Sequence, residues 1–223
     1  MDKKHAEKIL FQLTKHYPDA KIILTYSNNF ELLVSVMLSA QTTDTQVNKV
    51  TKNLFPKYRK PVAEFILLYE KFSGIGIPND QLTEIVNFAN VPTLDLEKDI
   101  RSIGLYKNKA KNVKAAAQMI LTDFRGRIPK TIGELVKIPG VGRKTANVVL
   151  GNAYGIVEGI AVDTHVARLS RTYGFTRQKD PVKIEKDLMN LFGKKNWFKL
   201  TYLLIEHGRS VRKLKKDFIL EKN

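Results

Sequence analysis

Residues 135–146 read LVKIPGVGRKTA: an apolar stretch, a turn with two glycines, and the start of a second helix-like stretch. Glycine adopts backbone conformations that are closed to other residues and lets another chain approach closely. A helix that begins directly after such a turn presents unpaired backbone N–H groups and a positive dipole end. The stretch therefore predicts a helix–turn–helix that binds phosphate. The Pro-Gly-Val-Gly turn alone also fits a plain corner without a ligand.

A weaker copy of this pattern precedes it in the chain. Residues 103–113 share their pattern with residues 138–148, and their turn reads Gly104-Leu105-Tyr106. The matching positions are Ile103, Lys109, Asn112 and Val113 in the first copy, and Ile138, Lys144, Asn147 and Val148 in the second. Both copies read as a helix, a tight turn and a second helix.

Helical spacing of apolar residues continues outward from these copies, and no segment shows sustained strand alternation. Two helices are expected within residues 30–55, because the small and polar residues 39–42 interrupt the apolar face. Further helices are predicted at residues 62–72, 82–88, 96–103, 107–124, 132–138, 143–154, 164–173, 181–191 and 197–218. Glycine and proline mark the breaks between them. The sequence predicts an all-α fold.

The chain has 223 residues and a formal net charge of +16, with 43% apolar residues. This is the composition of a globular protein, and the excess of positive charge favours nucleic acid as partner. No cysteine is present, which excludes disulfides, thiolate zinc sites and iron–sulfur clusters. No uncharged stretch approaches the roughly 20 residues of a membrane span. We expect a cytoplasmic, monomeric protein that associates with nucleoid DNA and has no membrane contact.

Several motifs together resemble one protein family. Residues 138–150 (IPGVGRKTANVVL), followed by residues 160–166 (IAVDTHV), look like the helix-hairpin-helix signature of endonuclease III, a DNA glycosylase with AP lyase activity. Residues 30–33 (FELL), 38–44 (LSAQTTD) and 103–106 (IGLY) also match, in the family's order. The resemblance extends over about residues 7–209.

The chain departs from the family pattern in three places. The family usually ends in four cysteines that hold an iron–sulfur cluster, but Arg212 stands where the first is expected, so we expect no cofactor. Residues 57–80 look like an insertion, and the loop at residues 155–159 is slightly long.

The resemblance implies two catalytic residues. Lys144 would form a Schiff base with the sugar, although a lysine at this position is also typical of a simple phosphate contact. Asp163 would be the carboxylate that stabilises the positive charge on the sugar and assists proton transfer. Its position before Thr164 also predicts a helix cap. His165 is interpreted as a packed helix residue.

Further residues are expected to contact DNA. By resemblance, Gln41 fills the hole left by an extruded base and Leu105 wedges between base steps. An interhelical polar contact for Gln41 and a plain turn position for Leu105 are the alternatives. The other predicted DNA-binding residues are Lys109, Gly140, Val141, Gly142, Arg143 and Thr145.

The resemblance implies two all-α lobes: a six-helix barrel at residues 22–154, and a second lobe formed by residues 1–21 and 155–223, with DNA in the cleft between them. Relatives that excise adenine carry glutamate where Ser35 stands and commonly lack the lysine. Ser35 with Lys144 therefore favours a bifunctional enzyme for oxidised pyrimidines in double-stranded DNA, acting on damaged bases and abasic sites. A monofunctional glycosylase and a non-catalytic DNA-binding protein are the alternatives.

Overall fold

The structure, a computed structural model, describes residues 2–60 and 79–214. Within these ranges every regular element is a helix, which confirms the predicted all-α class. The helix expected at residues 62–72 and most of the expected insertion lie outside the described residues. None of the described helices is long and apolar enough to cross a membrane.

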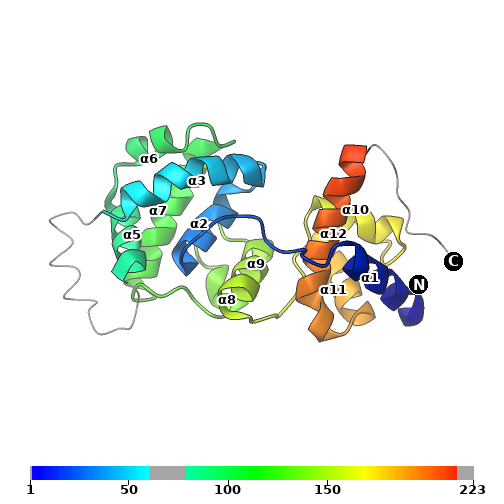
Figure 1. Cartoon of the computed structure of the whole chain (residues 1–223). Helices are drawn as coiled ribbons and strands as arrows, with labels where there is room; N and C mark the ends of the chain where they lie inside the picture. Colours follow the sequence, from blue (N-terminus) through cyan, green and yellow to red (C-terminus); the bar gives the residue numbers. More distant parts are fainter. Residues whose placement is uncertain (1, 61–78, 215–223) are drawn as a thin grey trace. The chain divides into compact units, whose positions relative to one another are not determined.

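Figure 1 shows the described helices, coloured and labelled in chain order. They are α1 (Lys3–His16), α2 (Asn29–Leu38), α3 (Asp44–Tyr58), α5 (Asn79–Asn90), α6 (Thr93–Asp99), α7 (Tyr106–Thr122), α8 (Ile132–Leu135), α9 (Arg143–Tyr154), α10 (Thr164–Thr172), α11 (Pro181–Leu191) and α12 (Lys194–Leu214).

The chain divides into two compact units. One consists of residues 23–154, and the other combines residues 1–22 with residues 155–223. The division lies one residue beyond the boundary expected at residue 22.

The α2 helix forms the centre of the 23–154 unit. Every residue from Phe30 to Leu38 is buried, and α2 packs against α3, α5, α7 and α9 (Figure 1). A helix that is covered on all sides lacks a polar face, which explains the nearly continuous apolar sequence. The C-terminal end of α2 leads directly into the turn that carries Gln41.

Helix α6 is shifted from its predicted position, and α8 ends at Leu135 instead of residue 138. The sequence predicts a helix at residues 96–103, whereas α6 covers Thr93–Asp99. Pro92 precedes its first turn, because proline lacks a backbone N–H and is tolerated at helix starts. Residues 100–104 form turns instead and lead to Leu105.

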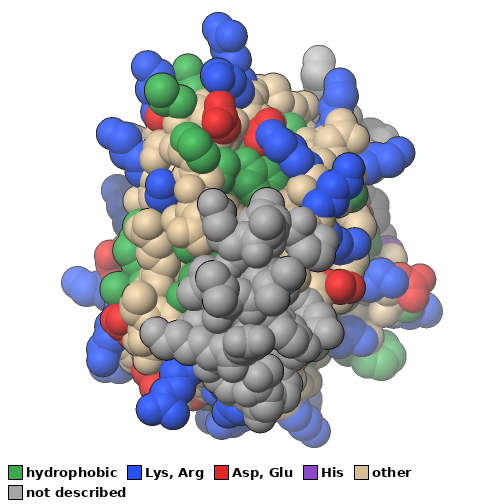
Figure 2. Space-filling model, turned by 90° about the vertical axis from the view of Figure 1, so that its left-hand side faces the viewer, with side chains coloured by type: hydrophobic (Ala, Val, Ile, Leu, Met, Phe, Trp, Pro, Cys, Tyr) green, Lys and Arg blue, Asp and Glu red, His purple; other side chains and the backbone are tan. Residues whose placement is uncertain are grey.

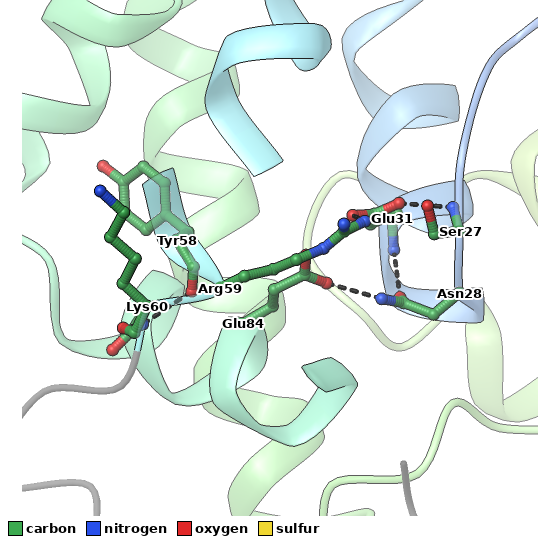
Figure 3. A network of polar contacts seen from close by, with 8 residues as sticks. Ser27, Asn28, Glu31, Tyr58, Arg59, Lys60 and Glu84 are labelled. Atoms are coloured by element: carbon green, nitrogen blue, oxygen red, sulfur yellow. Dashed lines mark hydrogen bonds and ion pairs between the residues drawn. The ribbon is translucent and has the colours of Figure 1, made fainter. Parts of the chain in front are cut away.

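A buried ionic network ties α2, α3 and α5 together (Figure 3). Arg59 forms ion pairs with the buried carboxylates of Glu31 and Glu84. Asn28 Nδ2 donates to Glu84 at 2.7 Å, and the Ser27 backbone N–H donates to Glu31 at 2.5 Å. Burial, followed by the proximity of Glu31, raises the pKa of Glu84 to about 8. One arginine thus serves two buried acids, and the cost of burying two carboxyl groups side by side holds the pKa of Glu84 well above its ordinary value.

The second unit packs α12 against α1 and α10. Leu203, Leu204 and Val211 of α12 are buried, so these residues belong to the apolar side of the helix. His207, 1% exposed, lies between two tyrosines. Its Nδ1 lies 3.0 Å from the Tyr17 hydroxyl, and its Nε2 lies 2.5 Å from that of Tyr173.

Candidate active site

The hairpin that the sequence singled out is present. Helix α8 is capped by Thr131, whose Oγ1 accepts from the Glu134 N–H, and after a turn α9 begins at Arg143. Gly140 has φ +79°, and a Cβ there would lie 2.9 Å from the Cβ of Asn112. Both the left-handed backbone and the contact with α7 therefore require glycine at this position.

Lys144 is the second residue of α9, and its side chain is exposed. Arg143 and Gly142 are exposed beside it, and Thr145 is half-buried. Val141 is only 6% exposed, so its side chain is buried and not available at the surface. The first N–H groups of a helix have no acceptor within the helix. The turn therefore combines an anion-binding helix end with an exposed amine.

Asp163 is the N-cap residue of α10, in the other unit of the chain. Its Oδ1 accepts a hydrogen bond from the Val166 N–H at 2.8 Å, which confirms the predicted helix cap. His165 packs against α12, because a Cβ on Gly208 would lie 2.5 Å from its Nδ1. This fits the interpretation of His165 as a packed residue.

Gln41 and Leu105 lie on neighbouring loops of the 23–154 unit. Both are exposed, and both have left-handed backbones, with φ of 55° and 58°. A Cβ on Gly104 would lie 3.3 Å from the Gln41 carbonyl oxygen, and Gln46 Nε2 donates to Ser102 Oγ at 2.8 Å. The structure thus brings together two residues that are far apart in the sequence.

The structure contradicts the expectation that Lys109 contacts DNA phosphate. Its ammonium is buried and donates to the Leu38 and Ala40 carbonyl oxygens at 2.8 Å and 2.5 Å, and to Thr42 Oγ1 at 3.0 Å. An ammonium has three N–H donors, and these contacts use all of them. The charge of Lys109 therefore acts inside the protein, on the loop that carries Gln41.

Sequence reasoning did not identify Asn112 as the residue that packs against Gly140, or Thr42 as a hydrogen-bond acceptor for Lys109. The internal repeat is the signal that could have drawn attention to the first copy, because it places Lys109 where the second copy has Lys144. The pattern does not tell which of the two lysines points inward. In the structure Lys109 is buried and Lys144 is exposed.

Positive side chains are not gathered into a single patch on the face of the molecule shown in Figure 2. Lys and Arg side chains are spread over this face, with Asp and Glu side chains among them.

The iron–sulfur cluster that the resemblance implies does not fit this chain. The chain has no thiolate donor, since it contains no cysteine. The ring nitrogens of His207, close to where the cluster loop would begin, face tyrosine hydroxyls. Among the described residues, no group of three or more His, Asp and Glu side chains could hold a metal ion.

Comparisons with known proteins show to which family the chain belongs. Residues 34–194 match the family model of the HhH-GPD superfamily base excision DNA repair protein. Endonuclease III of Bacillus subtilis (strain 168) is 44% identical over 207 residues, which cover 92% of this chain and 83% of that protein. Endonuclease III of a Synechocystis species is 41% identical over 209 residues, 94% of this chain and 84% of that protein.

A solved structure is similar over nearly the whole chain. A trapped endonuclease III–DNA covalent intermediate in an estranged-adenine complex has a TM-score of 0.80 and 41% identity, and the match covers 94% of this chain and 87% of that one. The chain therefore belongs to the endonuclease III family of the HhH-GPD superfamily of base excision DNA repair proteins.

Proposed function

We propose that the protein is a bifunctional DNA glycosylase and AP lyase. It removes oxidised pyrimidines from double-stranded DNA in the cytoplasm and then cleaves the strand at the abasic site. The observation that carries this proposal is the exposed amine of Lys144 at the start of α9, directly after the glycine turn, in a chain of the endonuclease III family.

The hairpin would bind the DNA backbone next to the damaged nucleotide. Backbone N–H groups at the start of α9 and the positive dipole end favour a phosphate there. The side chains of Arg143 and Thr145 flank this end of the helix. Such contacts orient the strand but carry no sequence information, which suits an enzyme that searches for damage.

Lys144 would supply the nucleophile. Its neutral amine attacks C1′ of the nucleotide, the bond from C1′ to the base breaks, and the base leaves with a proton. Opening of the sugar gives a Schiff base between C1′ and Nζ. Loss of a proton from C2′ then breaks the C3′–O bond, and water hydrolyses the Schiff base to restore the lysine.

Asp163 would stabilise the positive charge that develops on the sugar and accept a proton from the attacking amine. Its Oδ1 already accepts from the Val166 N–H, which fixes the orientation of the carboxylate. One side chain thus serves as a helix cap and as an acid-base group.

Extrusion of the base would depend on Gln41 and Leu105. Leu105 is 57% exposed at the tip of a turn, which is the placement that a wedge between base steps requires. Gln41 presents an amide that can hydrogen-bond the orphaned partner base.

Reduction with borohydride tests the central step. On a duplex that contains one abasic site, the wild-type protein should cleave the strand and become covalently trapped. Lys144→Gln should abolish both, with binding retained. Strand cleavage that persists in Lys144→Gln would show that the nucleophile is another group. Base release without strand cleavage by the wild type would indicate a monofunctional glycosylase, and binding alone a DNA clamp.

A further inference from the structure

The side chain of Lys109 reaches from α7 to the loop between α2 and α3. Its three acceptors are the carbonyl oxygens of Leu38 and Ala40 and the hydroxyl of Thr42. These residues lie on both sides of Gln41, whose backbone is left-handed. All three donors of the ammonium thus converge on five consecutive residues with Gln41 among them.

These contacts give the loop hydrogen-bond donors for its carbonyl groups and hold its backbone in place. The last carbonyl groups of a helix have no donor within the helix, and a positive charge at this end interacts favourably with the helix dipole. Lys109 fulfils both needs at the end of α2. A non-glycine residue rarely adopts a left-handed backbone unless its surroundings hold it there, and the contact with Ala40 fixes the residue directly before Gln41.

The backbone of Lys109, in the first turn of α7, contacts the other loop. Its N–H donates to the Leu105 carbonyl oxygen at 3.1 Å and closes the first turn of α7. One residue therefore stabilises the Leu105 turn through its backbone and the Gln41 turn through its side chain. The close approach of Gly104 to Gln41 leaves little room between the two loops.

We propose that Lys109 is a positioning residue, which holds Gln41 beside Leu105 so that both enter the duplex together when a damaged base is extruded. This role rests on the proposed function. We assign this role to Lys109 in place of a phosphate contact, because all three N–H donors of its ammonium already bind acceptors inside the protein.

The first test compares two substrates in single turnovers: a duplex with one paired thymine glycol, and the same duplex with a preformed abasic site. Lys109→Met removes the ammonium and keeps an unbranched apolar side chain. It should slow excision of the paired lesion by about 10-fold to 100-fold, the usual loss when a catalytic arrangement is misplaced. Cleavage at the abasic site, where no base has to be extruded, should change by about twofold at most.

A double-mutant cycle shows whether Lys109 acts through Gln41. Gln41→Ala alone should impair excision of the paired lesion, and Lys109→Met should add little to it, because residues that act as one unit are not additive. Thr42→Val, which removes a single acceptor with little change of shape, should give a smaller loss of the same kind. This variant keeps the test valid if Lys109→Met folds poorly.

Lys114 provides the matched control. Its ammonium, on the same helix, donates to the Val91 carbonyl oxygen at 2.9 Å, away from both loops. Lys114→Met should lower thermal stability without changing the ratio of the two activities. The role of Lys109 is overturned if Lys109→Met slows both substrates equally and adds fully to Gln41→Ala.

Amide hydrogen exchange separates this role from the proposed function. The Thr42 N–H donates to the Ser39 carbonyl oxygen at 3.1 Å across the Gln41 turn. Lys109→Met should accelerate its exchange, and Lys114→Met should not, whether or not the protein excises bases. Unchanged exchange at Thr42 would overturn the positioning role, whereas a wild-type protein inactive on both substrates would overturn only the enzyme assignment.

Discussion

Asn112 of α7 lies directly against Gly140 of the hairpin turn, so that a Cβ on Gly140 would stand 2.9 Å from the Cβ of Asn112. The first copy of the internal repeat thus packs against the glycine turn of the second copy. The contact also holds the hairpin turn, which directly precedes α9, against α7 of the same unit.

Gly140→Ala should damage the hairpin. The added methyl group is strained in the left-handed backbone and clashes with Asn112, so the free energy of unfolding should fall by about 1 to 3 kcal/mol. The affinity for DNA should fall for damaged and undamaged duplexes alike. Gly133→Ala is the control, because nothing lies within 4 Å of a Cβ there. Urea unfolding and duplex titration measure both effects, and equal behaviour of the two variants would contradict the packing argument.

The salt dependence of DNA binding should distinguish Arg143 from Lys109. Arg143→Ala should reduce the slope of log affinity against log salt by about one unit, because one phosphate contact is lost. Lys109→Met should leave the slope unchanged, since its ammonium is enclosed by the Gln41 loop. A slope that falls in Lys109→Met would show that this lysine reaches phosphate after all.

Asp163→Asn should retain the fold and lose catalysis. The amide oxygen of asparagine can still accept from the Val166 N–H, so the melting temperature should change little. Without the negative charge, excision should drop by about 10² to 10⁴-fold. Asp180→Asn is the matched control for the loss of a charge at a helix cap, because Asp180 caps α11 through the Lys183 N–H. Normal excision by Asp163→Asn would reduce its role to capping.

Glu84 should make stability depend on pH. Its pKa in the folded protein is raised to about 8, whereas that of an unfolded glutamate is about 4.3. Between these values the folded state keeps a proton that the unfolded state releases, so the free energy of unfolding should fall as pH rises through this window and level off above it.

Urea unfolding at several pH values measures this effect in the wild type and in Glu84→Gln. Glutamine cannot titrate, so the decline between about pH 5 and 8 should be shallower in the variant, by up to about 1.4 kcal/mol per pH unit. Parallel curves would mean that Glu84 is ionised in the folded protein throughout.

His207 should stabilise the second unit without iron. Burial raises the pKa of Tyr173 to about 12, so its hydroxyl remains protonated beside the imidazole. His207→Leu leaves two tyrosine hydroxyls without this partner and should lower the free energy of unfolding by about 2 to 4 kcal/mol. His16→Ala, at an exposed position, should cost about 0.5 kcal/mol or less. Stoichiometric iron in active protein would contradict the expectation that no cluster is needed.

The sequence by itself determined the features that depend on local spacing. Apolar periodicity predicted most helices, the glycine turn predicted the hairpin before α9, and the position before Thr164 predicted the Asp163 cap. These features form from neighbouring residues through backbone hydrogen bonds and capping, so a short stretch contains the information. The boundaries of α6 were less well predicted, because proline at residue 92 moved its start.

Only the tertiary structure decided which side chains are buried and which neighbouring element buries them. Lys109 and Lys144 occupy equivalent places in the repeat, yet one is buried and the other exposed. The difference comes from the end of α2, whose carbonyl oxygens surround the first lysine. The adjacency of Gln41 and Leu105 has the same origin, because periodicity identifies the buried side of a helix but not the neighbour that covers it.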